Sequence, residues 1–259
     1  MPRPERYDSA AAAVADIPDG SSILVAGFHA GVPWNLMQAL WEQGASDLVM
    51  ISTTVNRPLR DEDGRVTIAD LVLAGRVRKV IASFTAAPHP SQPNAAEDVF
   101  REGGADAELV PQGTVAERIR AGGAGIPAFY TPAGVGSAYA ERREQREFDG
   151  RSYVLERGIT ADYAFVRAHQ ADEAGNLLYR RAARNFNPIM ATAGRCTIAE
   201  VDEPFLEAGE IDPDQVHTPG VYVARLVHIA EGRINAPRRT RRSGRELDLD
   251  ADDGAGGGS

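Results

Sequence analysis

The sequence contains one cysteine, Cys196, and one lysine, Lys79, among its 259 residues. A single cysteine cannot form a disulfide within the chain, which excludes a disulfide-rich secreted framework and predicts a reducing, cytoplasmic location. The apolar neighbours of Cys196 favour a buried structural thiol over a nucleophile. Residues 1–8 lack the apolar stretch of a signal peptide, and no apolar run is long enough to span a membrane.

Several other chemical signals are also missing. The net charge of -9 makes a broad nucleic-acid surface unexpected, so no nucleic acid and no membrane are predicted as partners. The five histidines are scattered, with no metal-binding spacing, so no metal site is predicted. The Walker A loop, the dinucleotide-binding fingerprint and the G-x-S-x-G elbow are absent, which argues against the enzyme classes that use them.

What the sequence does contain is a regular alternation of strand and helix signals in its first half. Such alternation predicts βαβ units and an α/β fold: an open, mostly parallel sheet with flanking helices. The expected helices are 9–15, 33–44, 68–74 and 94–100, and the expected strands are 23–26, 48–51, 80–82 and 105–110. Residues 55–65 indicate a surface loop, and 86–93, with three prolines, an irregular segment.

The second half is richer in strands. An Asp-Gly pair at 149–150 predicts a hairpin, and further strands are expected at 163–168, 177–179, 198–201 and 221–227, giving a mixed sheet continuous with the first. The composition changes again after residue 237, from arginines through aspartates to a glycine-rich end. We therefore expect one domain over 1–237 and a disordered tail over 238–259.

The segment around Gln112 is the strongest candidate for a site. Pro111 ends an apolar run that predicts a buried strand, and Thr114 with Glu117 forms a capping-box pattern that predicts a helix from Val115. Gln112 and Gly113 would then lie in a strand-to-helix turn, where an α/β sheet forms its ligand crevice and a helix N-terminus can stabilise an oxyanion. The alternative is that Gln112 only pads or caps a turn.

Three further segments could border a ligand. Gly122, Gly123 and Gly125 follow the expected helix, where they could admit a close ligand or make a tight connection between packed elements. Gly27, Phe28, His29 and Gly31 form a loop after the first buried strand. Asn185 and Asn187 stand at an expected strand-to-helix junction, where Asn187 could cap a helix starting at Ile189 or face a substrate.

These segments, in this order, resemble the alpha subunits of class I CoA-transferases, the 3-oxoacid and 3-oxoadipate group. Residues 111–118, running into 121–132, carry the closest resemblance. Further matches are Asp19-Gly20, Gly27-Phe28, Gly31-Val32-Pro33, residues 185–188, 197–201 and 210–213, so the resemblance covers 11 to about 227.

The resemblance implies a fold, a partner and a reaction. Such chains pair with a homologous beta subunit, as αβ or α2β2, and a glutamate of the beta chain attacks the acyl-CoA thioester and becomes a glutamyl-CoA intermediate. The coenzyme A thioester is a substrate, and no permanently bound cofactor is expected. By the same resemblance, Gln112 donates a hydrogen bond to the thioester carbonyl oxygen, and the three glycine and asparagine segments lie near the substrate.

The sequence also departs from the family pattern. Ala26 replaces the usual glycine, the 53–69 stretch is longer, and 86–90 replaces a Gly-Glu-Asn motif. These changes fall in loops that would border the acyl group. Two alternatives therefore stay open: a CoA-thioester hydrolase or C–C-cleaving lyase on the same scaffold, and a non-catalytic acyl-CoA-binding subunit.

Overall fold

The computed structural model describes most of the chain. The described residues are 3–28, 30–86, 94–229, 234, 239–240 and 246–247. Of the sequence-based predictions, the irregular segment at 86–93 falls almost entirely outside them, and so does His29.

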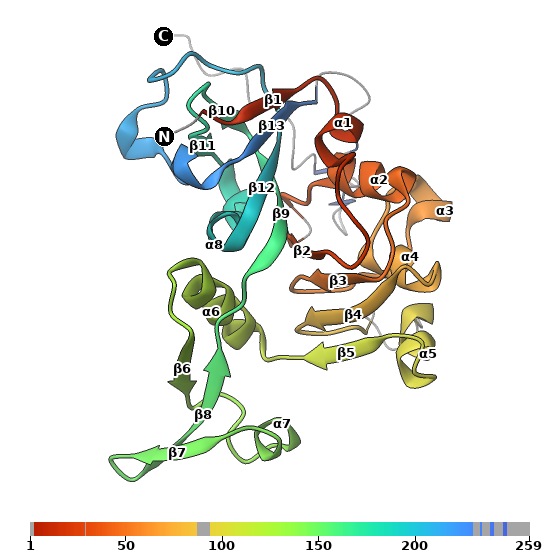
Figure 1. The fold of residues 1–259 in the computed structure, drawn as a ribbon, viewed down its shortest axis with the longest axis vertical. Coiled ribbons are helices and arrows are strands. Elements are labelled where there is room, and N and C mark those ends of the chain that lie inside the picture. The colour runs from red at the N-terminus through yellow and green to blue at the C-terminus, as the bar shows by residue number, and fades with distance from the viewer. Residues whose placement is uncertain are drawn as a thin grey trace.

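Eight strands form one sheet in the order β1-β13-β12-β9-β2-β3-β4-β5 (Figure 1). Every neighbouring pair in it is parallel, which confirms the predicted fold class. The strands predicted at 163–168, 198–201 and 221–227 continue this sheet as parallel strands, the last of them starting only at Arg225. The strand predicted at 177–179 does not join it, because β11 (Leu177–Leu178) pairs antiparallel with β10 (Gln170–Ala171) in a separate sheet. The strands are β1 (Glu5–Tyr7), β2 (Ser22–Val25), β3 (Leu48–Ile51), β4 (Val77–Ala82), β5 (Asp106–Leu109), β9 (Ala161–Ala168), β12 (Gly194–Val201) and β13 (Arg225–His228).

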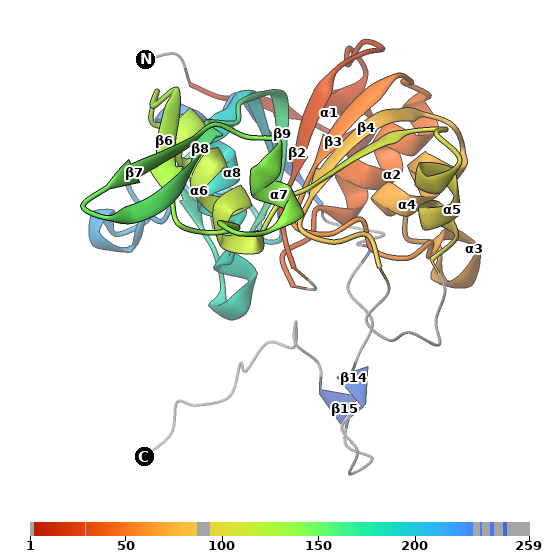
Figure 2. The ribbon, with the colours of Figure 1, turned by 90° about the horizontal axis from the view of Figure 1, so that it is seen from below.

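Helices cover both faces of this sheet, giving three layers (Figure 2). On one face lie α1 (Ala10–Val14), α2 (Trp34–Gln43), α4 (Ile68–Leu73) and α5 (Ala95–Arg101), and on the other lie α6 (Gln112–Gly123) and α8 (Asn187–Ala193). Side chains alternate along each strand between the two faces. On β2, for example, Ile23 packs into the first core and Leu24 into the second.

The helix boundaries follow local capping chemistry. Ser9 and Asn94 accept hydrogen bonds from the first turns of α1 and α5, as expected of N-cap residues. Thr67 and Asp70 form a reciprocal capping box at α4. Gly44 ends α2 with φ of 96°, a left-handed conformation that favours glycine.

A smaller antiparallel sheet projects away from the main one (Figure 1). Its strands are β6 (Ala128–Thr131), β7 (Gln145–Phe148) and β8 (Arg151–Arg157), in the order β6-β8-β7, with α7 (Ala138–Glu141) beside them. We call residues 128–157 the arm. The predicted Asp-Gly hairpin joins β7 to β8, with positive φ at Asp149 and Gly150.

The remaining elements are short. They are α3 (Arg60–Asp63), β10 (Gln170–Ala171), β11 (Leu177–Leu178), η1 (Arg181–Arg184), η2 (Pro213–Gln215), η3 (Gly220–Tyr222), β14 (Arg239–Thr240) and β15 (Glu246–Leu247). In the 238–259 segment the structure describes only the paired strands β14 and β15, so the disordered tail stays a prediction.

Two local predictions were wrong. The strand expected to be buried before Pro111 is β5, which among the described residues is the edge strand of the sheet, and Leu109 on it is 49% exposed. The 55–65 surface loop contains α3, and Val55 is fully buried in the core under α4. In both places the chain's position in the tertiary structure overrides local composition.

Candidate active site

The order of the strands reverses between β2 and β9. From β2 the chain proceeds outward through β3, β4 and β5, then crosses to β9 and proceeds the other way through β12 and β13. Ligands of open α/β sheets bind in the crevice outside the carboxyl ends of strands at such a reversal. The loop after β2 lies at this reversal, and the segments after β3, β4 and β5 leave the same edge of the sheet progressively further from it. We take these segments together as the candidate site.

The 27–31 loop follows β2 at this edge, as predicted. Gly27 has φ of 97°, and a Cβ there would meet Val32 at 2.6 Å, so both conformation and space require glycine. Phe28 is 37% exposed and packs edge-on against Phe84, which follows β4, with ring centroids 6.3 Å apart. The loop thus reaches across the end of β3.

Asn185 and Asn187 hold this loop in place. Asn185 donates to the carbonyl of Ala30 at 2.9 Å, and the buried Asn187 donates to Gly31 at 3.0 Å and accepts from the backbone of Arg167 at 2.9 Å. The structure therefore brings the two predicted segments together. The expectation that Asn187 caps a helix at Ile189 was wrong, because α8 begins at Asn187 itself and the side chain bonds to the loop instead.

Gln112 is an exposed residue in the first turn of α6, at the carboxyl end of β5. Helix α6 begins three residues earlier than predicted, after Pro111, and Thr114 forms no capping box. The pattern was misleading because a proline at the helix entry already fixes the backbone for it. Gln112 and Gly113 thus contribute first-turn N–H groups, which have no partner within the helix.

Buried hydroxyls lie at the same edge. Thr53 follows β3 and pairs in register with Ser83 after β4, and Thr114 is in the first turn of α6. The side-chain oxygens of all three are buried without a hydrogen-bond partner among the described residues. Since an unpaired buried hydroxyl is costly, these three side chains have the capacity to bond waters or ligand groups.

The second glycine segment lies at the other end of α6, where Gly122 and Gly123 are about 15–17 Å from Gln112 at the helical rise per residue. A Cβ on Gly122 would lie 2.0 Å from the carbonyl oxygen of Ile159, and one on Gly123 would lie 2.4 Å from Thr192 Oγ1. Gly125 has φ of 72° and open space around it. These positions support the tight-connection interpretation of Gly122 and Gly123.

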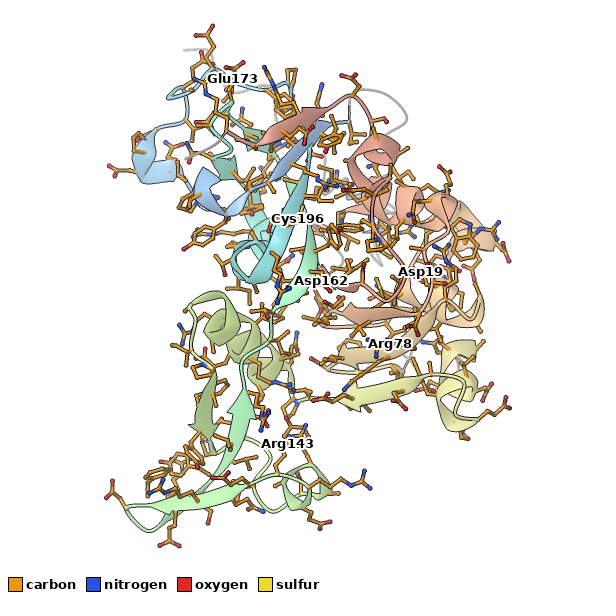
Figure 3. The ribbon with its side chains drawn as sticks, viewed as in Figure 1. Asp19, Arg78, Arg143, Asp162, Glu173 and Cys196 are labelled. Atoms are coloured by element: carbon orange, nitrogen blue, oxygen red, sulfur yellow. The ribbon has the colours of Figure 1, made fainter. Side chains whose placement is uncertain are left out.

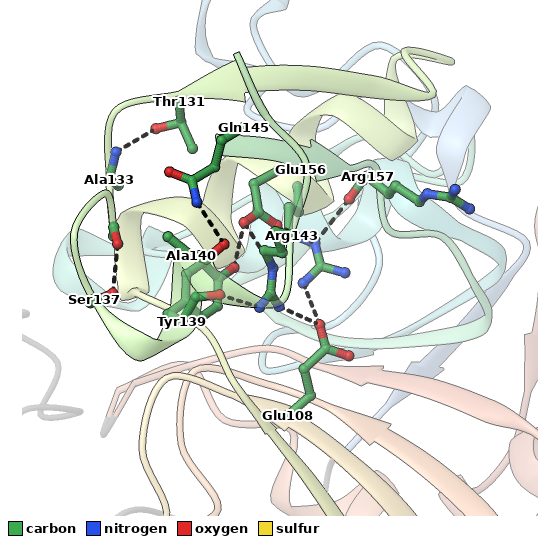
Figure 4. A network of polar contacts seen from close by, with 12 residues as sticks. Glu108, Thr131, Ala133, Ser137, Tyr139, Ala140, Arg143, Gln145, Glu156 and Arg157 are labelled. Atoms are coloured by element: carbon green, nitrogen blue, oxygen red, sulfur yellow. Dashed lines mark hydrogen bonds and ion pairs between the residues drawn. The ribbon is translucent and has the colours of Figure 1, made fainter. Parts of the chain in front are cut away.

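A network of ion pairs fixes α6 between the sheet and the arm (Figure 4). Arg118 of α6 contacts Glu108 of β5 at 2.8 Å and Glu156 of β8 at 3.6 Å, and Arg143 contacts the same two carboxylates at 3.3 Å each. Burial opposes ionisation of Glu108, but hydrogen bonds from Lys79 and Arg118 outweigh it and lower its pKa to about 2. Figure 3 labels Arg143, which reaches from the arm to Glu108 of β5.

Sequence reasoning missed a second buried charge, Glu200 of β12. Its carboxylate accepts from the backbone N–H groups of Asn35 and Leu36 at 3.0 Å each and so caps α2, although 165 residues separate Asn35 from it. Desolvation raises the pKa of Glu200 to about 7 against the opposing effect of Arg167. The matched 197–201 motif contained this residue, but its role depends on a long-range contact.

Cys196 and His217, the other residues considered from the sequence, pack against neighbouring side chains and backbone. Cys196 lies half-buried on β12, where burial raises the pKa of its thiol (Figure 3). His217 accepts a hydrogen bond from the backbone of Tyr179 and stacks on its ring. Among the described residues, no His, Cys, Asp or Glu cluster could hold a metal, and no helix could cross a membrane.

Comparison with known proteins decides the family. The model of the family described as coenzyme A transferase matches residues 7–228. The chain belongs to the coenzyme A transferase family. It is 47% identical over 225 residues to the A-type subunit of 3-oxoadipate CoA-transferase from Pseudomonas putida, with 86% of this chain and 93% of the relative covered.

Other comparisons agree. The A-type subunit of succinyl-CoA:3-ketoacid coenzyme A transferase from Xanthomonas campestris is 45% identical over 242 residues, covering 93% of this chain and 95% of the relative. The resemblance to CoA-transferase alpha subunits is thereby confirmed. Among solved structures, glutaconate coenzyme A-transferase from Acidaminococcus fermentans shares the fold, with a TM-score of 0.71 and 20% identity over 86% of this chain and 75% of that one.

One structural neighbour has a different named activity. A variant of the decarboxylase AibA/AibB matches with a TM-score of 0.70 and 27% identity, covering 88% of this chain and 84% of that one. The solved structures that share this fold therefore include one named a decarboxylase.

Proposed function

We propose that this chain is the alpha subunit of a heteromeric CoA-transferase that moves CoA from an acyl-CoA to a 3-oxo acid or a dicarboxylate. Its relatives at 45–47% identity are named as the A-type subunits of enzymes with such substrates. The observation that carries the site is the exposed Gln112 in the first turn of α6, at the carboxyl edge of the sheet.

In this proposal the partner beta subunit supplies the nucleophile. Its glutamate attacks the thioester carbonyl, the C=O electrons move onto oxygen, and collapse expels CoA thiolate to leave an acyl-glutamyl anhydride. The thiolate then attacks the glutamyl carbonyl, which releases the acyl carboxylate and leaves glutamyl-CoA. The acceptor carboxylate reverses both steps, so no water or redox partner is consumed.

Gln112 would stabilise the oxyanion formed in these steps. Its amide N–H is a neutral donor, and the first-turn N–H groups of α6, including that of Gly113, add the positive end of the helix dipole. One preorganised donor of this kind contributes about 2.7–4 kcal/mol in a transition state. Because Gln112 is exposed, a second chain has direct access to it.

The 27–31 loop would form the neighbouring wall of the substrate site. Gly27, Phe28 and Gly31 remain the proposed substrate contacts there, with His29 as an untested member, while Asn185 and Asn187 position the loop. The cavity between this loop and the ends of β2 and β3 measures about 10 Å³, room for one water but not for an acyl group. Substrate would therefore bind outside the loop.

The glycines at the far end of α6 fit this site less well. Gly122 and Gly123 contact the chain's own backbone and side chains closely, which supports a packing role. Gly125 has open surroundings and stays a predicted contact. Coenzyme A enters as a substrate, and a cytoplasmic location and an αβ or α2β2 assembly complete the proposal.

A lyase is the second candidate, because the AibA/AibB neighbour is named a decarboxylase. Intact-mass measurement of the complex with the partner chain, following incubation with an acyl-CoA panel, separates the two. A CoA adduct on a glutamate of the partner, with none on this chain, supports transfer. If no adduct forms, release of CO2 would replace the transferase proposal with a lyase, and free CoA formed without an acceptor acid would replace it with a hydrolase.

A further inference from the structure

The arm has one face that the rest of the described chain leaves uncovered. Along β8, Val154 and Glu156 are buried on the inner side, whereas Tyr153 and Leu155 are partly exposed on the other. Cross-strand register places Tyr130 opposite Leu155, Arg146 opposite Tyr153 and Phe148 opposite Arg151. Directly paired residues share a face. We call the following residues the outer face: Tyr130, Arg146, Phe148, Arg151, Tyr153, Leu155 and Arg157.

Aromatic rings cover the middle of the outer face. The Phe148 ring centroid lies 5.1 Å from that of Tyr130 and 5.6 Å from that of Tyr153, and Phe148 is 39% exposed. Arg146 lies over the Phe148 ring at 5.2 Å and Arg151 over the Tyr153 ring at 5.7 Å. Arginines and aromatic rings are the residue types enriched at protein–protein interfaces.

The positive charge of the outer face is only partly balanced there, by the carboxylate of Glu144, which accepts a hydrogen bond from the Tyr130 hydroxyl at 2.6 Å. Within the described part of the chain, Arg146, Arg151 and Arg157 form no ion pair with a carboxylate. The chain as a whole carries a net charge of -9, so this cluster differs in sign from the average surface. A partner surface that carries carboxylates would complement it.

The arm is held rigidly for such a contact. Buried Glu156, 2% exposed, receives Arg118 from α6, Arg143 and the hydroxyl of Tyr139, and Arg143 also covers the Tyr139 ring at 3.6 Å (Figure 4). These contacts hold the arm within this chain before association, which reduces the conformational entropy lost on binding.

We propose that the outer face docks the second subunit of the enzyme through a carboxylate-bearing surface. This inference rests on the proposed function, which supplies the second chain. A second copy of this chain fits the outer face poorly, because a two-fold contact of the face with itself would bring the same three arginines into opposition. A flat sheet face also suits a protein surface better than it suits a small anion.

The test is the affinity between this chain and its partner, measured by titrating a fluorescently labelled chain. The Arg146→Glu/Arg151→Glu variant should raise Kd at least tenfold, with a weaker salt dependence than wild type. The matched control is Arg78→Glu/Arg101→Glu, with the same charge change on β4 and α5, away from the arm (Figure 2). It should stay within twofold.

Folding is checked by the melting temperature of each variant, and Arg146→Gln/Arg151→Gln provides a milder change if the reversal does not fold. An unchanged Kd in a folded arm variant would overturn the proposal. The proposal would also be overturned if the arm variant lost only a higher-order assembly while the heterodimer persisted, or if the isolated variant chain lost CoA binding. Gln112→Ala should keep the wild-type Kd, so failure of the proposed oxyanion role and failure of the docking surface give different results.

Discussion

Gly122→Ala is expected to destabilise the protein strongly for a change of one methyl group. The added Cβ would lie 2.0 Å from the carbonyl oxygen of Ile159, 2.4 Å from its carbonyl carbon and 2.8 Å from its nitrogen. These are backbone atoms, and the Ile159 N–H is itself bonded to the Arg118 carbonyl at 2.7 Å, so no flexible side chain can move aside. Either α6 or the link from β8 to β9 must shift.

Forced overpacking of this kind costs about 1–3 kcal/mol, and a backbone obstacle places it near the upper end. The intrinsic preference of a helix for alanine over glycine offsets about 0.5–1 kcal/mol. A net loss of about 2 kcal/mol should lower Tm by about 4–8 °C for a domain of this size.

Gly113→Ala is the matched control in the same helix. Apart from its chain neighbours and its own helix backbone, no atom lies within 4 Å of the position that its added methyl group would occupy, and its φ is not positive. Stability should therefore be unchanged or rise by up to about 1 kcal/mol. Urea unfolding followed by circular dichroism measures both variants. A Gly122→Ala protein as stable as wild type would refute the packing role assigned to Gly122.

Three further predictions concern buried or half-buried polar groups. The fold raises the pKa of Glu200 to about 7, so the stabilising contribution of this side chain is complete below pH 4.5 and declines as pH rises through 7. The difference in unfolding free energy between wild type and Glu200→Gln should therefore change by about 3 kcal/mol across that range. A difference that stays constant with pH would contradict this prediction. The fold lowers the pKa of Glu108 to about 2, so its stabilising contribution is present above pH 4.5 and is lost on acidification towards pH 2. The unfolding free energy of Glu108→Gln should be up to about 3 kcal/mol below that of wild type at pH 7, and the two values should converge near pH 2 in acid titrations. Asn187→Ala leaves Gly31 and its other partners unpaired, at about 1–3 kcal/mol each, and should raise KM for the acyl-CoA; unchanged stability in urea and unchanged KM would exclude its positioning role.

Local chemistry in the sequence was sufficient for much of the fold. The alternation of strand and helix signals predicted the parallel sheet. The helix starts near residues 9 and 94 and the Asp149-Gly150 turn were also correct, because each depends on neighbours within a few residues. The exposure of β5 and the burial of Val55 were not predictable in this way. Both depend on which strand lies at the sheet edge, a property of topology and not of local composition.

The site shows the same division. Sequence position identified Gln112 and the 27–31 loop at strand ends, but not that Asn185 and Asn187 reach that loop across more than 150 residues. Glu200 escaped notice for the same reason, since a glutamate inside an apolar strand gives no sign of the helix it will cap. Gly122 lies far from Gln112 because α6 includes both residues, near its opposite ends. The capping pattern at Thr114 had predicted a shorter helix that began after Gln112.

The most direct test of the account is the turnover of Gln112→Ala in the complex with the partner chain, beside Arg120→Ala, an exposed α6 residue whose hydrogen bonds join it to Glu117. Loss of one oxyanion donor should lower kcat about 100- to 1000-fold, with KM and the affinity for the partner little changed, while Arg120→Ala stays within about twofold. A Gln112→Ala complex with wild-type kcat would contradict the proposed role of this chain in the reaction.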